Sequence, residues 1–473
     1  MDGHEHRRLG DAAFGGGRVD LGGDGAGGRF RLGYGDLMAL AGDYFAIEDV
    51  PATTGTLAGD NLFSLARIPG DAGRKVNTRD EIVCALKVMS IDEAYADERF
   101  GPGGEFAHVE FSPFAASSDV ERRVRDRYLE RAATNDDHFV APGGVTHDRR
   151  PAPFGTATLA YRHFHELALE VACRLGRSGG DLSLAMAREA AAQHFLSDAF
   201  TSGHLRTPVA QIRRFWHARY PTFWHNLQDW VADRTAATLS ERSWALRPLP
   251  GSFVHDATAS ALQRRTSRYP QLSLGDFLAR LFHDWDNEHG LATDGGAVVF
   301  GDGHIHEGDT GELVLRAARA GIDDVEAAFA LGVAGSRLDG AALFGAVRAA
   351  TGAPGDVFLA EAEIPRPAAS NLPQNWRAPD IETLWSSPML GTGGVTVGEA
   401  LIEMLQPSGQ FIRQLDSLGQ GLVDPHGLLA VPLLGGWLSR KGAEAYHHGF
   451  VEPLAADPER TILAVVHNEA GRA

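Results

Sequence analysis

The sequence predicts a mostly α-helical protein, and three observations support this. Apolar residues recur at helical spacing in several stretches, most clearly in Thr158–Leu175. Stretches in which apolar and polar residues alternate are scarce, and the best candidate strands are Ala297–Phe300 and Ile462–Val466. Apolar residues make up 44% of the chain and charged residues 22%, as is usual for a folded globular protein.

Local signals delimit the expected helices. Gly176 ends the helix 158–175, Gly179 begins a turn, and Asp181 is a good N-cap for a helix over Leu182–Phe200. The glycine-rich residues 15–28 have the composition of a flexible loop. The other expected helices are Leu37–Tyr44, Val120–Ala133, Gln211–Trp216, Thr222–Thr238, Leu274–Asn287, Glu312–Ala320, Val325–Leu331, Ala341–Thr351, Val397–Leu405 and Leu428–Ala445.

A chain of 473 residues is long enough for two or three domains, or for one large domain with an extension. The segment Ala353-Pro354-Gly355 and the prolines that follow it mark a boundary near residue 351. We therefore expect a domain over residues 1–350 and a C-terminal helical extension of unknown role over 351–473.

Composition excludes several classes of protein. The net charge of −18 argues against a broad basic surface for nucleic acid. Two cysteines cannot make a disulfide framework, and the longest apolar run, Leu428–Leu438, is too short to span a bilayer. The start of the chain lacks the hydrophobic region of a signal peptide. We therefore expect a soluble, cytoplasmic chain as written, or a secreted one if a signal has been removed or export is non-classical.

The motif that carries chemistry lies at the end of the helix expected over 182–200. His194 and Asp198 are four residues apart, so they share one helical face, and His204 follows just beyond the helix end. Histidine nitrogens and carboxylate oxygens are ligands of zinc. A hydrogen-bonded pair on the helix surface is the simpler interpretation. The apolar residues around the pair favour a metal site, because a buried carboxylate needs a charged partner.

This His-x-x-x-Asp-x-x-x-x-x-His pattern resembles the metal signature of the zinc-dependent phospholipase C and single-strand nuclease superfamily, in its bacterial phospholipase C-like branch. The resemblance implies a multi-helical domain that binds two or three zinc ions. It also implies that His138, in Asp136-Asp137-His138-Phe139, is another ligand.

The resemblance implies further ligands at the start of the chain. A histidine should enter the first helix, and we prefer His6 to His4 because it puts Leu9 and Ala13 on one helical face. The family also uses an N-terminal tryptophan, which this chain lacks near its start. Asp43 is our choice for an aspartate that bridges two metal ions. An equally good interpretation is that Asp43 is a solvated loop residue without a metal.

A final pair, a histidine followed by a carboxylate, has two candidates. His225 and Asp229 repeat the His-x-x-x-Asp spacing. His283, accompanied by Asp286 or Asn287, lies in a stretch that resembles a bacterial branch of the superfamily, and we favour it.

Other histidines are expected to have ordinary surface roles. His163 and His165 are two residues apart, so they cannot face one another on a helix, and we expect a surface cluster. No partner for His447 and His448 is evident in the sequence.

The resemblance implies a zinc-dependent phosphoric diester hydrolase of the phospholipase C type, which cleaves a phospholipid to diacylglycerol and a phosphorylated head group in lipid metabolism. Asp43 or Asp198 would orient the attacking water. The expected partner is a phospholipid, with transient contact with a membrane surface and no transmembrane segment. One alternative is a single-strand-specific nuclease of the same superfamily, the one case with a nucleic-acid partner. The other is a catalytically inactive helical metal-binding or interaction protein.

Overall fold

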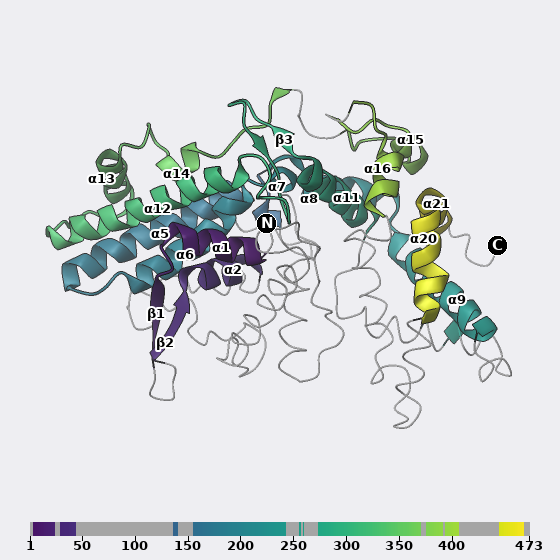
Figure 1. Cartoon of the computed structure of the whole chain (residues 1–473), viewed down its shortest axis with the longest axis horizontal. Helices are drawn as coiled ribbons and strands as arrows, with labels where there is room; N and C mark the ends of the chain where they lie inside the picture. Colours follow the sequence, from purple (N-terminus) through teal and green to yellow (C-terminus); the bar gives the residue numbers. More distant parts are fainter. Residues whose placement is uncertain are drawn as a thin grey trace. The chain divides into compact units, whose positions relative to one another are not determined.

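The computed structural model describes residues 3–23, 29–43, 136–140, 155–242, 255–256, 259, 273–369, 375–390, 393–405 and 444–467 (Figure 1). Within these residues the fold is mostly α-helical, which confirms the predicted class. The chain forms two compact units, each built from several stretches of sequence. Unit 1 comprises 1–106, 134–208 and 286–372, and unit 2 comprises 107–133, 209–285 and 373–473. The sequence predicts a contiguous division at residue 350 instead.

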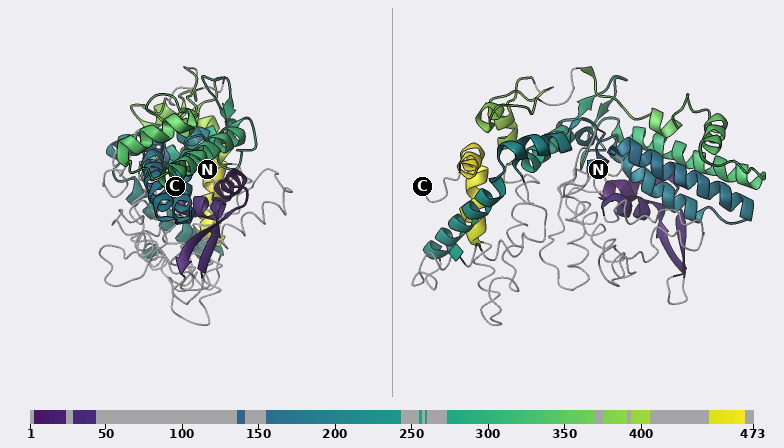
Figure 2. Two further views of the ribbon diagram at one scale, coloured as in Figure 1. Left: turned by 90° about the vertical axis from the view of Figure 1, so that its left-hand side faces the viewer. Right: turned by 180° about the vertical axis from the view of Figure 1, so that it is seen from behind.

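Unit 1 is a bundle of helices with a small hairpin. Its elements are α1 (Gly3–Ala13), β1 (Arg18–Gly23), β2 (Arg29–Gly33), α2 (Tyr34–Asp43), η2 (Asp136–His138), α5 (Ala157–Ser178), α6 (Ser183–Asp198), α7 (Ser202–Arg206), β3 (Leu291–Ala292), β4 (Val298–Val299), α12 (Thr310–Val333), α13 (Gly340–Thr351) and α14 (Leu359–Ala362). Helices α5, α6 and α12 run side by side, and α1 and α2 lie against α6 (Figures 1 and 2).

Helix α6 is the centre of unit 1 because it is buried on every side. From Ala185 to Asp198 each of its residues is buried, and five of the apolar ones are alanines that let neighbouring helices approach: Ala185, Ala187, Ala190, Ala191 and Ala192. The N-cap of α6 is Leu182 rather than the predicted Asp181, which lies one residue earlier and accepts a hydrogen bond from the Ser183 backbone at 2.9 Å. A helix this deeply buried normally carries few polar residues, so those that it does carry require partners.

Helices α5 and α12 pack unusually closely at two glycines. A Cβ atom on Gly176 would lie 2.3 Å from the Phe329 carbonyl oxygen, and one on Gly332 would lie 2.1 Å from the Cys173 carbonyl oxygen. Only glycine permits such an approach between two helix backbones.

Unit 2 is a second helical assembly. Its elements are α8 (Val209–Arg219), α9 (Phe223–Arg242), most of α11 (Leu274–His289), α15 (Ile381–Trp385), α16 (Val397–Met404), the π-helical turn η4 (His447–Val451), α20 (Glu452–Ala456) and α21 (Pro458–Val466). The C-terminal elements pack on α9, where the Asn226 side chain donates a hydrogen bond to the Val466 carbonyl at 3.3 Å. The last residues of α11, from Asp286, belong to unit 1.

Two predicted elements are wrong and one is confirmed. Residues 18–23 and 29–33 form an antiparallel hairpin rather than a flexible loop, because Val19 and Leu32 pair across it and are both buried. The segment Ile462–Val466 is helical rather than a strand, since the Asp457 carboxylate caps α21 by accepting from the Arg460 backbone at 3.1 Å. The strand predicted near 297–300 is present as β4, paired with β3.

One further difference concerns helix limits, and two predicted helices lie wholly or mostly outside the described residues. The helices predicted over 312–320 and 325–331 are one continuous helix, α12. The helix predicted over 120–133, and all but the end of the one over 428–445, lie outside the described residues. In the part of the chain that the structure describes, no helix combines the length and apolar character needed to cross a bilayer.

Candidate metal centre

The last turn of α6 places His194 and Asp198 on one buried face. Both side chains are essentially inaccessible to solvent, and His194 Nε2 lies 3.5 Å from Asp198 Oδ2. The spacing therefore produces the shared face that the sequence predicts, in the interior of unit 1 rather than on a helix surface.

Asp198 is surrounded by histidines from four separate segments. Its carboxylate oxygens lie 3.4 Å from His6 Nε2, 2.6 Å from His138 Nδ1 and 3.3 Å from His204 Nδ1. His6 comes from α1, His138 from η2 and His204 from α7. We call His6, His138, His194, Asp198 and His204 the central group. These predicted ligands, far apart in the sequence, come together in the structure.

Two of the imidazoles turn Nε2 toward the carboxylate because Nδ1 is held by an oxygen. The Ser197 hydroxyl donates its proton to the helix carbonyls of Gln193 and His194, both at 2.8 Å, so His6 Nδ1–H donates to Ser197 Oγ at 2.9 Å. His194 Nδ1–H donates to the Met38 carbonyl at 2.9 Å. Such an oxygen partner on the far nitrogen is the usual arrangement for metal-binding histidines, since it fixes the ring orientation and the tautomer.

One ring nitrogen from each of His6 and His194 and a carboxylate oxygen of Asp198 all lie within 4.8 Å of one another. His6 Nε2 is buried and makes no hydrogen bond. A buried polar atom without a hydrogen bond requires an explanation, and a bound ion supplies one. The residues present therefore fit a metal ion, and His6, His194 and Asp198 are the three that could hold it.

His138 and His204 meet the carboxylate in a different way. Each turns Nδ1 toward Asp198, and His138 Nδ1 also lies 3.3 Å from His194 Nε2. The Thr201 hydroxyl donates to the Asp198 carbonyl at 3.0 Å, so His204 Nδ1–H donates to Thr201 Oγ1 at 2.9 Å. These two histidines therefore complete the group of imidazoles around the carboxylate.

The protonation states of two members suit metal binding. Burial, followed by the charge of nearby His6, lowers the pKa of His194 well below 6.5. Burial alone would raise the pKa of Asp198, but surrounding positive charges, including that of His204, hold it well below 3.8. A neutral imidazole and an ionised carboxylate are the ligand forms that a metal requires.

The turn that carries His204 is braced by the end of α11. Arg206 pairs with Asp286 through two hydrogen bonds, one of them from Nε at 2.8 Å. Asn287 Oδ1 accepts from the Gly203 backbone at 2.7 Å, and Ser202 Oγ donates to the Asp286 carbonyl at 2.7 Å. Asp286 and Asn287, expected beside His283, thus hold α7 in place.

The remaining predicted ligands are placed as follows. Asp43 is the last residue of α2, and its side chain lies outside the description. His225 and Asp229 are exposed on α9 in unit 2. His283 is buried in the unit 2 part of α11, where its Nδ1 lies 2.7 Å from Asp284 Oδ1. The ligand roles of these residues stay predictions.

A second buried polar cluster was missed from the sequence. His165, expected at the surface, is fully buried because α5 turns it toward α6 and α12. Its Nδ1 lies 2.6 Å from Glu189 Oε2, and its Nε2 lies 3.4 Å from Asp324 Oδ2. The available signal was Glu189 itself, a carboxylate within an alanine-rich helix that needs a charged partner.

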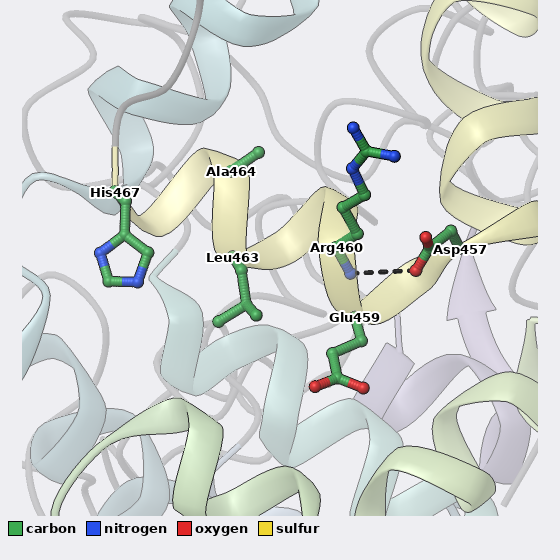
Figure 3. Close-up of a pocket in the computed structure, with 6 residues that line it drawn as sticks. All are labelled: Asp457, Glu459, Arg460, Leu463, Ala464 and His467. Atoms are coloured by element: carbon green, nitrogen blue, oxygen red, sulfur yellow. Dashed lines mark hydrogen bonds between the residues drawn. The ribbon is translucent and has the colours of Figure 1, made fainter. Parts of the chain in front are cut away.

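A hollow of about 350 Å³ lies elsewhere, along α21 in unit 2 (Figure 3). Asp457 and His467 mark its two ends, ten residues apart on one helix, which corresponds to about 15 Å. Its polar groups are therefore spread along the helix rather than convergent, and the hollow is a weaker candidate site than the central group.

No family model matches this sequence, and neither a curated protein nor a solved structure is significantly similar to it. The function must therefore be argued from the chemistry of the site.

Proposed function

We propose that the protein is a zinc-dependent phosphoester hydrolase, of the phospholipase C type, that acts on a phospholipid. The observation that carries this proposal is the convergence of one ring nitrogen from each of His6 and His194 and an Asp198 oxygen inside unit 1. Two imidazoles and one carboxylate are one of the ligand sets of catalytic zinc sites, which keep a further position for water or substrate.

When bound, zinc lowers the pKa of a coordinated water toward about 7 and neutralises phosphate oxygens. The protein contributes orientation and charge. Ser197 and the Met38 carbonyl fix two imidazole rings, and Asp198 supplies negative charge that offsets the cation. We assign Asp198 to orient the attacking water through its carboxylate, with Asp43 as the second candidate for this role.

Phospholipid is preferred as substrate because of the sequence resemblance, together with the composition of the chain. A single-strand nuclease needs cationic surroundings and stacking aromatic residues, and the net charge of −18 disfavours it. The remaining alternative is a metal-binding protein without catalytic turnover. In that case the same residues of the central group would bind the metal.

The test combines metal analysis with two substrates. The full chain, expressed with ample zinc, should contain zinc in the central group, and it should hydrolyse phosphatidylcholine vesicles in preference to a single-stranded oligonucleotide. Preference for the oligonucleotide would favour the nuclease. Zinc without either activity would favour the inactive binding protein. Less than one zinc per chain would contradict the metal centre itself.

A further inference from the structure

Two adjacent histidines and a glutamate converge on the surface of unit 2. His448 Nδ1 lies 2.7 Å from Glu452 Oε1, and His447 Nε2 lies 3.6 Å from the same oxygen. One ligand atom from each of the three lies within 4.8 Å of the other two. The side chains are 40%, 27% and 52% exposed in sequence order, so an ion can reach them from solvent. The sequence hints only at the pairing of His448 with Glu452, because on a regular helix His447 would point away from both.

The backbone explains how both imidazoles reach one carboxylate. On an α-helix His448 and Glu452, four residues apart, would share a face, whereas His447 would point elsewhere. Here the Glu452 backbone N–H donates to the His447 carbonyl, so the chain makes a π-helical turn that closes between residues five apart. The wider turn brings His447 over Glu452 as well. Such turns are rare, and they occur frequently at functional sites.

Packing on the opposite side holds the π turn without help from the three polar residues. Phe450 and Val451 are buried, and Gly449 lies so close to α9 that a Cβ atom on it would be 2.8 Å from the Arg234 carbonyl oxygen. The convergence is therefore part of the folded framework of unit 2, and the exposed histidines can be replaced without removing these buried contacts.

The charges around the glutamate keep it ionised. The hydrogen bond from His448 is the largest influence and lowers the pKa of Glu452. Burial opposes it slightly, and the charges of His448, His447 and Arg242 lower the pKa further. The effect of Arg242 on the pKa of Glu452 is the smallest of those named.

We infer that His447, His448 and Glu452 bind a divalent transition-metal ion such as Zn²⁺, at a site separate from the central group. Two imidazole nitrogens and one carboxylate oxygen suit Zn²⁺, Ni²⁺ or Cu²⁺, whereas Mg²⁺ and Ca²⁺ favour all-oxygen sites. Imidazoles bind a metal only in the neutral form, so protons compete with the ion and binding weakens as the pH falls.

The experiment is calorimetric titration of the chelator-stripped full chain with Zn²⁺. The double variant His447→Ala/His448→Ala should lose one class of sites, and Glu452→Gln should bind at this site about tenfold more weakly or worse. The matched control is His467→Ala. His467 Nε2 also lies 2.8 Å from a glutamate, Glu382, and is exposed, but it belongs to no convergent group in the described residues. It should leave the number of sites unchanged.

The same titration in an Asp198→Asn background separates this site from the central group. The surface site should persist there, and it should persist even if the wild-type central group binds no zinc. Equal zinc binding in wild type and His447→Ala/His448→Ala, with melting curves showing both folded, would overturn the inference. An equal loss in His467→Ala would overturn it as well.

Discussion

Asp198 is the residue on which the buried charge of unit 1 depends. Four histidines surround its carboxylate at 2.6–3.5 Å, and the side chain is almost completely buried. A buried carboxylate that loses its charge would leave these histidines without the group that orients them. Neutralising this carboxylate should therefore have a larger effect than removing any one hydrogen bond at the surface.

Replacing Asp198 by Asn tests this expectation. Asn keeps the size and one acceptor oxygen but removes the charge, and an amide is a poorer zinc ligand than a carboxylate. We expect central zinc to be lost and kcat/KM on phosphatidylcholine to fall about a hundredfold or more, or roughly 2.7 kcal/mol. The control is Asp181→Asn, at the exposed start of the same helix, which can still accept from the Ser183 backbone and should change neither quantity. Full zinc occupancy and full activity in Asp198→Asn would defeat the assignment.

The two candidates for the last ligand differ in burial, which gives a second prediction. His283 is buried against Asp284, whereas His225 is exposed. We expect His283→Ala to reduce hydrolysis more than His225→Ala, and circular dichroism should show that both variants fold. A near-complete loss in His225→Ala with normal turnover in His283→Ala would identify His225 as the ligand.

His165 should make stability depend on pH. Burial alone would lower its pKa, but Glu189 and Asp324 outweigh burial and raise the pKa from 6.5 to about 10. Because the folded pKa is the higher one, the stabilisation is complete below pH 6.5 and is lost as the pH rises through about 10. The measurement is the free energy of unfolding in urea at pH 7 and pH 9.5. Wild type should lose more stability over this interval than His165→Gln, and an equal loss would contradict the raised pKa.

At the scale of elements, α6 serves two polar clusters from different faces. His194 and Asp198 face α1 and η2, whereas Glu189 meets His165 of α5 and Gln193 donates to the Ala318 carbonyl of α12 at 2.8 Å. The close packing of α5 against α12 therefore positions the second cluster. This packing depends on Gly176 and Gly332, where the backbones touch.

Replacing Gly332 by Ala tests the helix contact. The new methyl would overlap the Cys173 carbonyl, so α5 and α12 must separate, at a cost of about 1–3 kcal/mol in the free energy of unfolding. The matched control is Gly345→Ala in α13, where a Cβ meets nothing within 4 Å. That change should stabilise the protein by up to about 1 kcal/mol, since alanine is the better helix former. Similar urea-unfolding curves for the two variants would contradict the close approach.

At the scale of the whole molecule, the central group joins segments that are remote in sequence. His6 and Ser197, which are hydrogen-bonded, are separated by 191 positions. An ion bound by His6, His194 and Asp198 would therefore cross-link α1 to α6 in the folded state alone, and its binding free energy would add to folding stability.

Metal removal should consequently lower the melting temperature. A ligand at about a thousandfold excess over Kd stabilises a protein by about 4 kcal/mol, and about 2–4 °C accompanies each kcal/mol for a unit of this general size. Calorimetry of the full chain with and without a chelator should therefore show a drop of several degrees. The Asp198→Asn variant should show a smaller drop, because only the surface site at His447, His448 and Glu452 would still bind the ion. Identical wild-type melting curves would count against a structural contribution of the metal.

The helical class, most helix positions and the central motif were predictable because they depend on local spacing. Apolar periodicity located α5, α6 and α11, and the four-residue spacing put His194 and Asp198 on one face. The strand predicted over 462–466 is instead the end of α21, because Asp457 caps this helix and Pro458 begins it. The glycine-rich hairpin was missed because its pairing joins two short stretches across a turn.

The sequence by itself determined which residues can act as ligands and which helical faces they occupy, since both follow from side-chain chemistry and helix geometry. Only the tertiary structure decided that His6, His138 and His204 meet Asp198, and that His165 lies between two carboxylates. The same holds for the π turn, which brings His447 to Glu452. These contacts depend on how remote helices pack and on where a backbone turn widens, and local spacing does not encode either one.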